Sequence, residues 1–151
     1  MLLTQALETY GRLGKLREAA LAHGDIGDAL TDAARPGEAI GHLDRARELL
    51  AGLPDPYNQA RTLARLGRAR ACAGERVKAT ETLEEALTGM REAQSPRGEA
   101  EVLRLLGELA EVEGQAGQAH QHYAAALMIL DPLGAPGAAV LRDQLARIGP
   151  R

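Results

Sequence analysis

Apolar residues recur along most of this chain at intervals of three and four, the spacing that places side chains on one face of a helix. Ala60, Leu63 and Leu66 show this spacing, as do Leu83 and Ala86. No segment has the sustained two-residue alternation of a half-buried strand. The pattern predicts an all-α chain of about eight helices, near 2–13, 17–34, 37–52, 56–73, 76–93, 97–113, 116–132 and 137–148.

The same pattern repeats after about 40 residues, and a fixed period of this length is typical of stacked helical units. The residues Ala60, Leu63, Leu66, Gly67 and Gly74 recur as Ala100, Leu103, Leu106, Gly107 and Gly114, while Pro56 recurs as Pro96 and Pro136. We therefore expect one domain over 1–151, with a half repeat at 1–13, full repeats near 17–53, 56–93 and 96–133, and a capping helix near 137–148. Asp55 and Ser95, each before a proline, are predicted helix N-caps.

Small residues occupy the predicted helix crossings, because antiparallel helices approach closely only where side chains are small. The structural repeat positions are Gly27, Ala39, Gly67, Ala79, Gly107 and Ala119. We expect Gly67 to meet Ala79 across one hairpin and Gly107 to meet Ala119 across the next.

The first unit fits the pattern least well. Its first helix contains Gly24 and Gly27, and each interior glycine costs about 1 kcal/mol relative to alanine. A break near Gly24 is the alternative to a continuous helix over 17–34. The segment 1–13 aligns with the second helix of a unit whose first helix is missing, so we expect either a fragment of a larger protein or self-association through the N-terminal helix.

These positions resemble the tetratricopeptide repeat, whose pattern is a large residue, Leu-Gly, a turn glycine, and then Ala, a large residue and Ala. The matching residues are Leu63, Leu66, Gly67, Gly74, Ala79, Leu83 and Ala86, and then Leu103, Leu106, Gly107, Gly114, Ala119, Tyr123 and Ala126. The first unit departs from the pattern at His23 and Ala34, and all the units are longer than the standard repeat of the family. The resemblance implies a right-handed α-solenoid of antiparallel helix pairs that binds a protein or peptide.

A narrower resemblance rests on composition. The units are rich in Ala, Leu, Gly and Arg, and Lys15 and Lys78 are the only lysines. In this they are similar to the C-terminal repeats of large actinobacterial transcription regulators of the SARP and STAND types. That resemblance implies a sensor or docking region, although a GC-rich genome gives the same arginine bias.

The family resemblance also implies that the first helix of each unit lines a concave groove. The expected lining is Leu21, Gly24, Asp28, Asp32, Arg61, Ala64, Arg68, Cys72, Glu101, Arg104, Glu108 and Val112, with Asp28, Arg61, Arg68, Glu101, Arg104 and Glu108 as the candidate peptide-binding residues. Across units, Asp28, Arg68 and Glu108 form a row of alternating charge, and Arg61 faces Glu101. These charges are either solvated ion pairs of about 0–1 kcal/mol each or, at the arginines, ligands for peptide carboxylates.

Composition narrows the range of functions. The formal net charge is −3 and aromatic residues are 2% of the chain, which argues against nucleic-acid binding and against aromatic ligand cages. The single cysteine excludes an internal disulfide and favours a reducing, cytoplasmic compartment. No apolar run approaches the length of a membrane span. None of these features excludes association of the chain into a homo-oligomer.

Candidate catalytic and metal-binding residues are few. His120 and His122 are two residues apart on a helix and point in different directions, so they are not expected to share a metal ion. We expect no metal site elsewhere in the sequence and no other cofactor. Cys72 is interpreted as a small apolar filler, with a reactive thiol as the alternative. Glu84, Glu85 and the cluster 111–113 are interpreted as solvated faces, while Tyr57 and Tyr123 are interpreted as packing residues. The sequence predicts a binding scaffold without catalytic residues, the other hypotheses being an oligomerisation module and a small enzyme or ligand-binding bundle.

Overall fold

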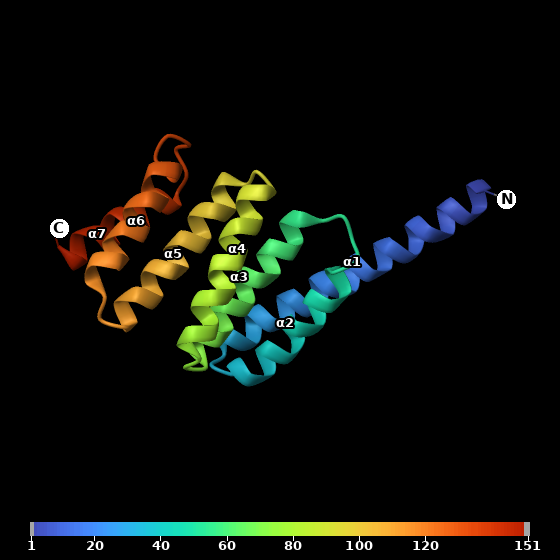
Figure 1. Ribbon diagram of the computed structural model, residues 1–151, viewed down its shortest axis with the longest axis horizontal. Helices are drawn as coiled ribbons and strands as arrows, with labels where there is room; N and C mark the ends of the chain where they lie inside the picture. The colour runs from blue at the N-terminus through green and yellow to red at the C-terminus, as the bar shows by residue number, and fades with distance from the viewer. Residues whose placement is uncertain (1, 150–151) are drawn as a thin grey trace.

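The computed structural model describes residues 2–149, whose regular structure is entirely helical. The helices are α1 (Leu2–Asp32), α2 (Pro36–Leu50), α3 (Pro56–Cys72), α4 (Arg76–Glu92), α5 (Pro96–Val112), α6 (Ala116–Leu130) and α7 (Gly137–Ile148). They pack as three consecutive hairpins, α1–α2, α3–α4 and α5–α6, with α7 against α6 (Figure 1). The predicted all-α solenoid is confirmed.

The N-terminal segment differs from its prediction. The sequence predicts separate helices over 2–13 and 17–34, but α1 is one unbroken helix of 31 residues, so residues 2–149 form seven helices rather than eight. Gly14 and Gly24 do not end the helix, because one glycine costs only about 1 kcal/mol and no proline adds to that cost. The N-terminal half of α1 therefore projects beyond α2 (Figure 1).

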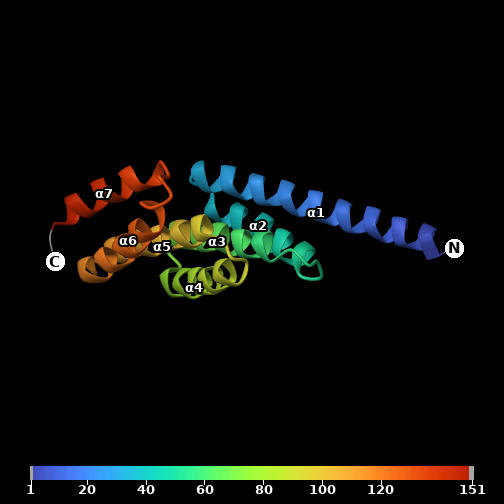
Figure 2. The same ribbon diagram turned by 90° about the horizontal axis from the view of Figure 1, so that it is seen from above.

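The hairpins are arranged along an arc. Viewed from above, α1 and α7 lie at opposite ends, on the same side of α3 and α5, and α4 lies on the opposite side of these two helices (Figure 2). The first helix of each hairpin therefore faces the inside of the arc, which is the placement that the repeat resemblance implies.

The turn that closes each hairpin has the same backbone conformation. Gly74 and Gly114 have φ angles of 82° and 76°, and Ala34, at the equivalent position of the first hairpin, has a φ of 59°. In all three turns the amide of the next residue donates to the carbonyl five residues earlier, as in a Schellman motif. Ala34 therefore adopts a left-handed conformation that its Cβ disfavours.

Replacing Ala34 by glycine is expected to stabilise the protein by about 1 kcal/mol, because glycine adopts a positive φ at no steric cost. The free energy of unfolding in urea measures the effect. Ala29→Gly, in the exposed interior of α1, is the control and should destabilise by about 1 kcal/mol. If both variants lose stability to the same degree, the turn is not strained.

Within each hairpin, a glycine of the first helix lets a large side chain of the second approach its backbone. A Cβ built on Gly67 would lie 2.6 Å from the Leu83 side chain, and one built on Gly107 would lie 2.5 Å from the Tyr123 ring. The nearest atoms to Gly67 thus belong to Leu83 rather than to Ala79, the expected neighbour. The three alanines of the pattern are fully buried: Ala39, Ala79 and Ala119.

The helix starts agree with the sequence. The side chains of Asp55 and Ser95 each accept a hydrogen bond at 3.1 Å from the backbone amide three residues later. Both predicted N-caps are confirmed.

The last helix closes the solenoid through both apolar and polar contacts. Leu141 is fully buried against the third hairpin. Arg147 donates to Glu111 of α5 at 2.7 and 3.0 Å, and the buried Tyr123 donates to the same carboxylate. The expectation that Glu111 lies on a solvated face is therefore wrong, whereas the core position of Tyr123 is confirmed. The bond from Arg147, supported by that from Tyr123, outweighs partial burial and lowers the pKa of Glu111.

Candidate peptide-binding groove

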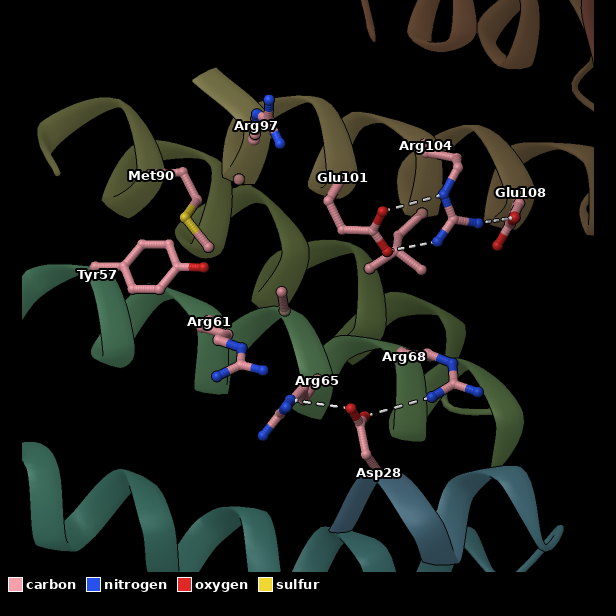
Figure 3. Close-up of a pocket in the computed structure, with 13 residues that line it drawn as sticks. Asp28, Tyr57, Arg61, Arg65, Arg68, Met90, Arg97, Glu101, Arg104 and Glu108 are labelled. Atoms are coloured by element: carbon pink, nitrogen blue, oxygen red, sulfur yellow. Dashed lines mark hydrogen bonds and ion pairs between the residues drawn. The ribbon is translucent and has the colours of Figure 1, made fainter. Parts of the chain in front are cut away.

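A cavity of about 580 Å³ opens on the inside of the arc, between the C-terminal half of α1, α3 and α5 (Figure 3). All six candidate residues line it: Asp28, Arg61, Arg68, Glu101, Arg104 and Glu108. Ala64, also expected in the groove, lies among the lining residues. The remaining expected positions are not part of it: Leu21, Gly24, Asp32, Cys72 and Val112.

On the α1 side, the wall is held together by ion pairs between α1 and α3. Asp28 accepts from Arg65 at 3.0 Å and from Arg68 at 3.4 Å. Asp25 lies 3.3 Å from the other end of the Arg65 guanidinium. A Cβ on Gly24 would lie 2.7 Å from this guanidinium, so the glycine makes room for Arg65 to lie against α1.

Arg68 reaches a second carboxylate on α1. It also binds Asp32, and this hydrogen bond is the main reason that the pKa of Arg68 is raised. Arg65 and Arg68 are therefore engaged by aspartates of the neighbouring helix.

On the α5 side, the charges pair within one helix. Arg104 binds Glu101 three residues earlier and Glu108 four residues later. Burial alone would lower the pKa of Arg104, but the bonds and charges of the two glutamates outweigh it and raise that pKa. Glu108 also accepts from Gln144 of α7 at 3.3 Å.

Two of the charge pairs predicted between units are not formed among the described residues. Glu101 pairs with Arg104 instead of Arg61, and Glu108 pairs with Arg104 instead of Arg68. The cavity separates the α3 arginines from the α5 carboxylates, while residues three and four apart on one helix meet readily. Only the predicted contact of Asp28 with Arg68 is present.

One end of the cavity therefore carries positive charge without an ion-pair partner in residues 2–149. Tyr57 and Arg61 come from α3 and Arg97 from the start of α5, on opposite walls of the half of the cavity in which Met90 lies (Figure 3). Neither arginine forms an ion pair with a described residue. Tyr57 is 44% exposed, so its interpretation as a packing residue is wrong.

The lining as a whole carries a cationic excess, although the chain has a net charge of −3. Five arginines and three carboxylates line the cavity. Sequence reasoning did not identify Tyr57, Arg65 and Arg97 as part of this site. A signal for Arg65 was present in the sequence, since it lies one repeat period after Asp25, as Arg68 does after Asp28.

Apart from Tyr57, the uncharged lining residues are apolar. Ala64, Met90 and Leu105 are buried side chains at the base of the cavity. Cys72 is exposed at the end of α3, so its interpretation as a packed filler is wrong. In the part of the chain that the structure describes, no three His, Cys, Asp or Glu side chains are placed to hold a metal ion, and no helix is apolar enough over a sufficient length to cross a membrane.

Comparison with known proteins agrees with the geometry. A sequence model described as tetratricopeptide repeat matches residues 17–92, half of the chain. The match covers the C-terminal half of α1 together with α2, α3 and α4, and so includes one wall of the cavity. No curated protein is similar enough in sequence to count as a match.

Proposed function

The chain belongs to the tetratricopeptide repeat family of protein-interaction scaffolds, and on this premise we propose that its groove binds an acidic peptide segment of a partner protein. The groove is the cavity between α1, α3 and α5. The observation that carries the proposal is the pair Arg61 and Arg97, two guanidinium groups at one end of the cavity with no ion-pair partner among the described residues.

The chemistry of the lining supports this assignment. A guanidinium matches a carboxylate with two parallel hydrogen bonds, and charge-assisted bonds of this kind are about twice as strong as neutral ones. The apolar base formed by Ala64, Met90 and Leu105 can receive an aliphatic side chain of the same peptide. The three carboxylates of the lining disfavour a phosphate backbone along the whole groove.

Binding of two labelled peptides tests the proposal. One peptide alternates glutamate and leucine, and the matched peptide has glutamine in place of each glutamate. Fluorescence anisotropy should show at least tenfold tighter binding of the acidic peptide, with the difference shrinking as salt rises. Equal affinities for the two peptides would contradict the proposal.

Arg68 provides a prediction on stability. Arg68→Ala is expected to change the free energy of unfolding by at most about 1 kcal/mol, because its bonds to Asp28 and Asp32 lie at a partly exposed surface. Urea denaturation measures this. If acidic-peptide affinity falls while stability is unchanged, Arg68 contacts the peptide in addition to supporting the wall.

We further propose that the chain is the sensor or docking region of a larger transcription regulator. This rests on the composition of the units, with 16 arginines and two lysines among the 18 basic residues. The full open reading frame around this sequence tests it. A frame that encodes no DNA-binding domain would contradict the proposal.

A second candidate function is association between copies through α1, and it is favoured by the projection of that helix beyond α2. Leu7, in the projecting half, is 63% exposed. Light scattering over a concentration series tests this candidate, because a mass that stays at one chain at high concentration excludes it.

A further inference from the structure

Two histidines meet across the first hairpin, away from the groove. The Nδ1 atoms of His23 on α1 and His42 on α2 lie 3.0 Å apart, and the ring centroids are 5.2 Å apart. At this distance the two nitrogens share one hydrogen bond, in which one ring carries the proton on Nδ1 and the other accepts it. Both side chains are half-buried.

This contact is particular to the first unit. Leu63 and Leu103 occupy the position equivalent to His23 in the other two units, and Thr82 and His122 occupy that of His42. Leu103 is buried in the apolar core of the third hairpin, and the partly buried Leu63 packs against the core of the second. The first hairpin, which carries the aspartates of the groove wall, thus has an imidazole where the other two hairpins have an apolar leucine.

The charged groups around the pair largely neutralise one another. Arg35, Glu38 and Arg45 line the cavity beside the two rings. Arg35 donates to Glu38 at 2.8 Å, and Arg45 lies 3.2 Å from Glu48. On the α3 side, Arg65 lies beside Gly24, the residue after His23, and is paired with Asp25 and Asp28. The protonation of the two rings therefore has a direct effect on their own contact.

We propose that the contact of His23 with His42 is a proton-sensitive latch that holds α1 against α2 and loosens when both rings become protonated. A neutral pair has one donor and one acceptor. A first added proton preserves this bond and gives it charge, which strengthens it. A second proton leaves two cationic N–H groups facing each other, and the hydrogen bond is lost. Because the second proton is added to a pair that already carries a charge, the latch loosens only at the more acid of the two steps.

Loosening the latch would also affect the groove, because α1 carries the aspartates of one groove wall. Gly27, one turn after His23, packs against Leu43, the residue next to His42, so the rings and this core contact separate together. Asp25, Asp28 and Asp32 follow on α1 and hold Arg65 and Arg68. Acid would therefore weaken one wall of the groove, and this consequence alone rests on the proposed function.

A double-mutant cycle tests the latch on the full chain. His23→Leu restores the residue of the other units, and His42→Thr introduces the residue found at position 82. Between pH 8 and pH 4, where both rings are protonated, the melting temperature of the original chain should fall by about 3–5 °C more than that of either variant. The double variant should behave as each single variant does, because both lack the same contact.

Two results would overturn the latch. One is an equal loss of melting temperature in the original chain and both variants. The other is that the two substitutions have additive effects, which means that the rings titrate independently. If His23→Leu fails to fold, the His42→Thr comparison still decides the first point. No peptide enters these measurements, so a failure of the proposed groove function leaves the test unaffected.

His122→Thr is the matched control, because it removes a half-buried histidine from another unit. Burial lowers the pKa of His122, so the folded state holds a proton less tightly than the unfolded state. Its neutral form therefore stabilises the fold at high pH, and this stabilisation is lost as pH falls through the ordinary histidine range. The change in melting temperature caused by His122→Thr should add to the change caused by His23→Leu.

Hydrogen exchange locates the opening. At pH 4, amides of α1 and α2 should exchange several-fold faster in the original chain than in His23→Leu, whereas those of α5 should not differ. The two proteins are compared at one pH, so the intrinsic pH dependence of exchange cancels. Equal exchange in α1 and α2 would contradict the latch.

Discussion

Gly107→Ala is expected to lower the free energy of unfolding by about 1–3 kcal/mol, the typical cost of forcing extra volume into a packed core. A Cβ at this position would lie 2.5 Å from the nearest atom of the Tyr123 ring. The ring cannot retreat without cost, because Tyr123 is fully buried and its hydroxyl is bonded to Glu111. The introduced methyl group therefore separates α5 from α6. Urea denaturation at constant pH measures the loss.

Gly41→Ala is the matched control, since it makes the same chemical change in the interior of another helix. No atom lies within 4 Å of a Cβ built on Gly41. Alanine is the better helix former, so this variant should gain about 0.5–1 kcal/mol. The two substitutions thus have opposite expected signs. A Gly107→Ala protein as stable as the original would show that the third hairpin is packed more loosely than its contacts indicate.

The contrast between these two glycines shows why the fold could be predicted well from the sequence. Gly107 recurs one repeat period after Gly67, so the period marked both as crossing positions, while Gly41 has no such counterpart. The period also predicted the hairpins, and the prolines that follow Asp55 and Ser95 predicted these two residues as N-caps. It failed at α1, where the second half of one predicted unit and the first half of the next are a single helix. Period and propensity locate helix faces, but a helix boundary without proline or a cap has no local signal.

The groove was predictable to a lesser extent, and for a different reason. The family resemblance implied twelve lining positions, and seven of them, including the six candidate residues, line one cavity. Ion-pair partners depend on the distance between helices, which the curvature of the arc sets. Arg104 had suitable glutamates both on its own helix and, by the repeat, across units, and only the coordinates distinguish these alternatives. Arg97 lies in the first turn of α5, four residues before Glu101 and so on the same helix face, but one turn earlier than the positions chosen for the lining.

Arg61→Glu and Arg97→Glu are each expected to weaken binding of the acidic peptide by about 10–100-fold. Each substitution removes a charge-assisted contact of about 1.5–3 kcal/mol and places a carboxylate where the peptide's own carboxylate would lie. Neither side chain forms an ion pair with a described residue, so the stability of the fold should change little. Fluorescence anisotropy gives the affinity, and thermal unfolding of the same samples verifies that each variant is folded.

Arg76→Glu controls for net charge, because it makes the same change at an exposed residue at the start of α4, outside the cavity lining. Its affinity for the peptide should stay within about twofold of the original, since the charge is screened beyond about 10 Å at 0.1 M salt. Comparable losses in all three variants would mean that the peptide responds to overall charge and has no defined position in the groove. Loss at Arg61 and Arg97 alone places its carboxylates at the end of the cavity near Tyr57, where the cationic groups of the lining lack partners within residues 2–149.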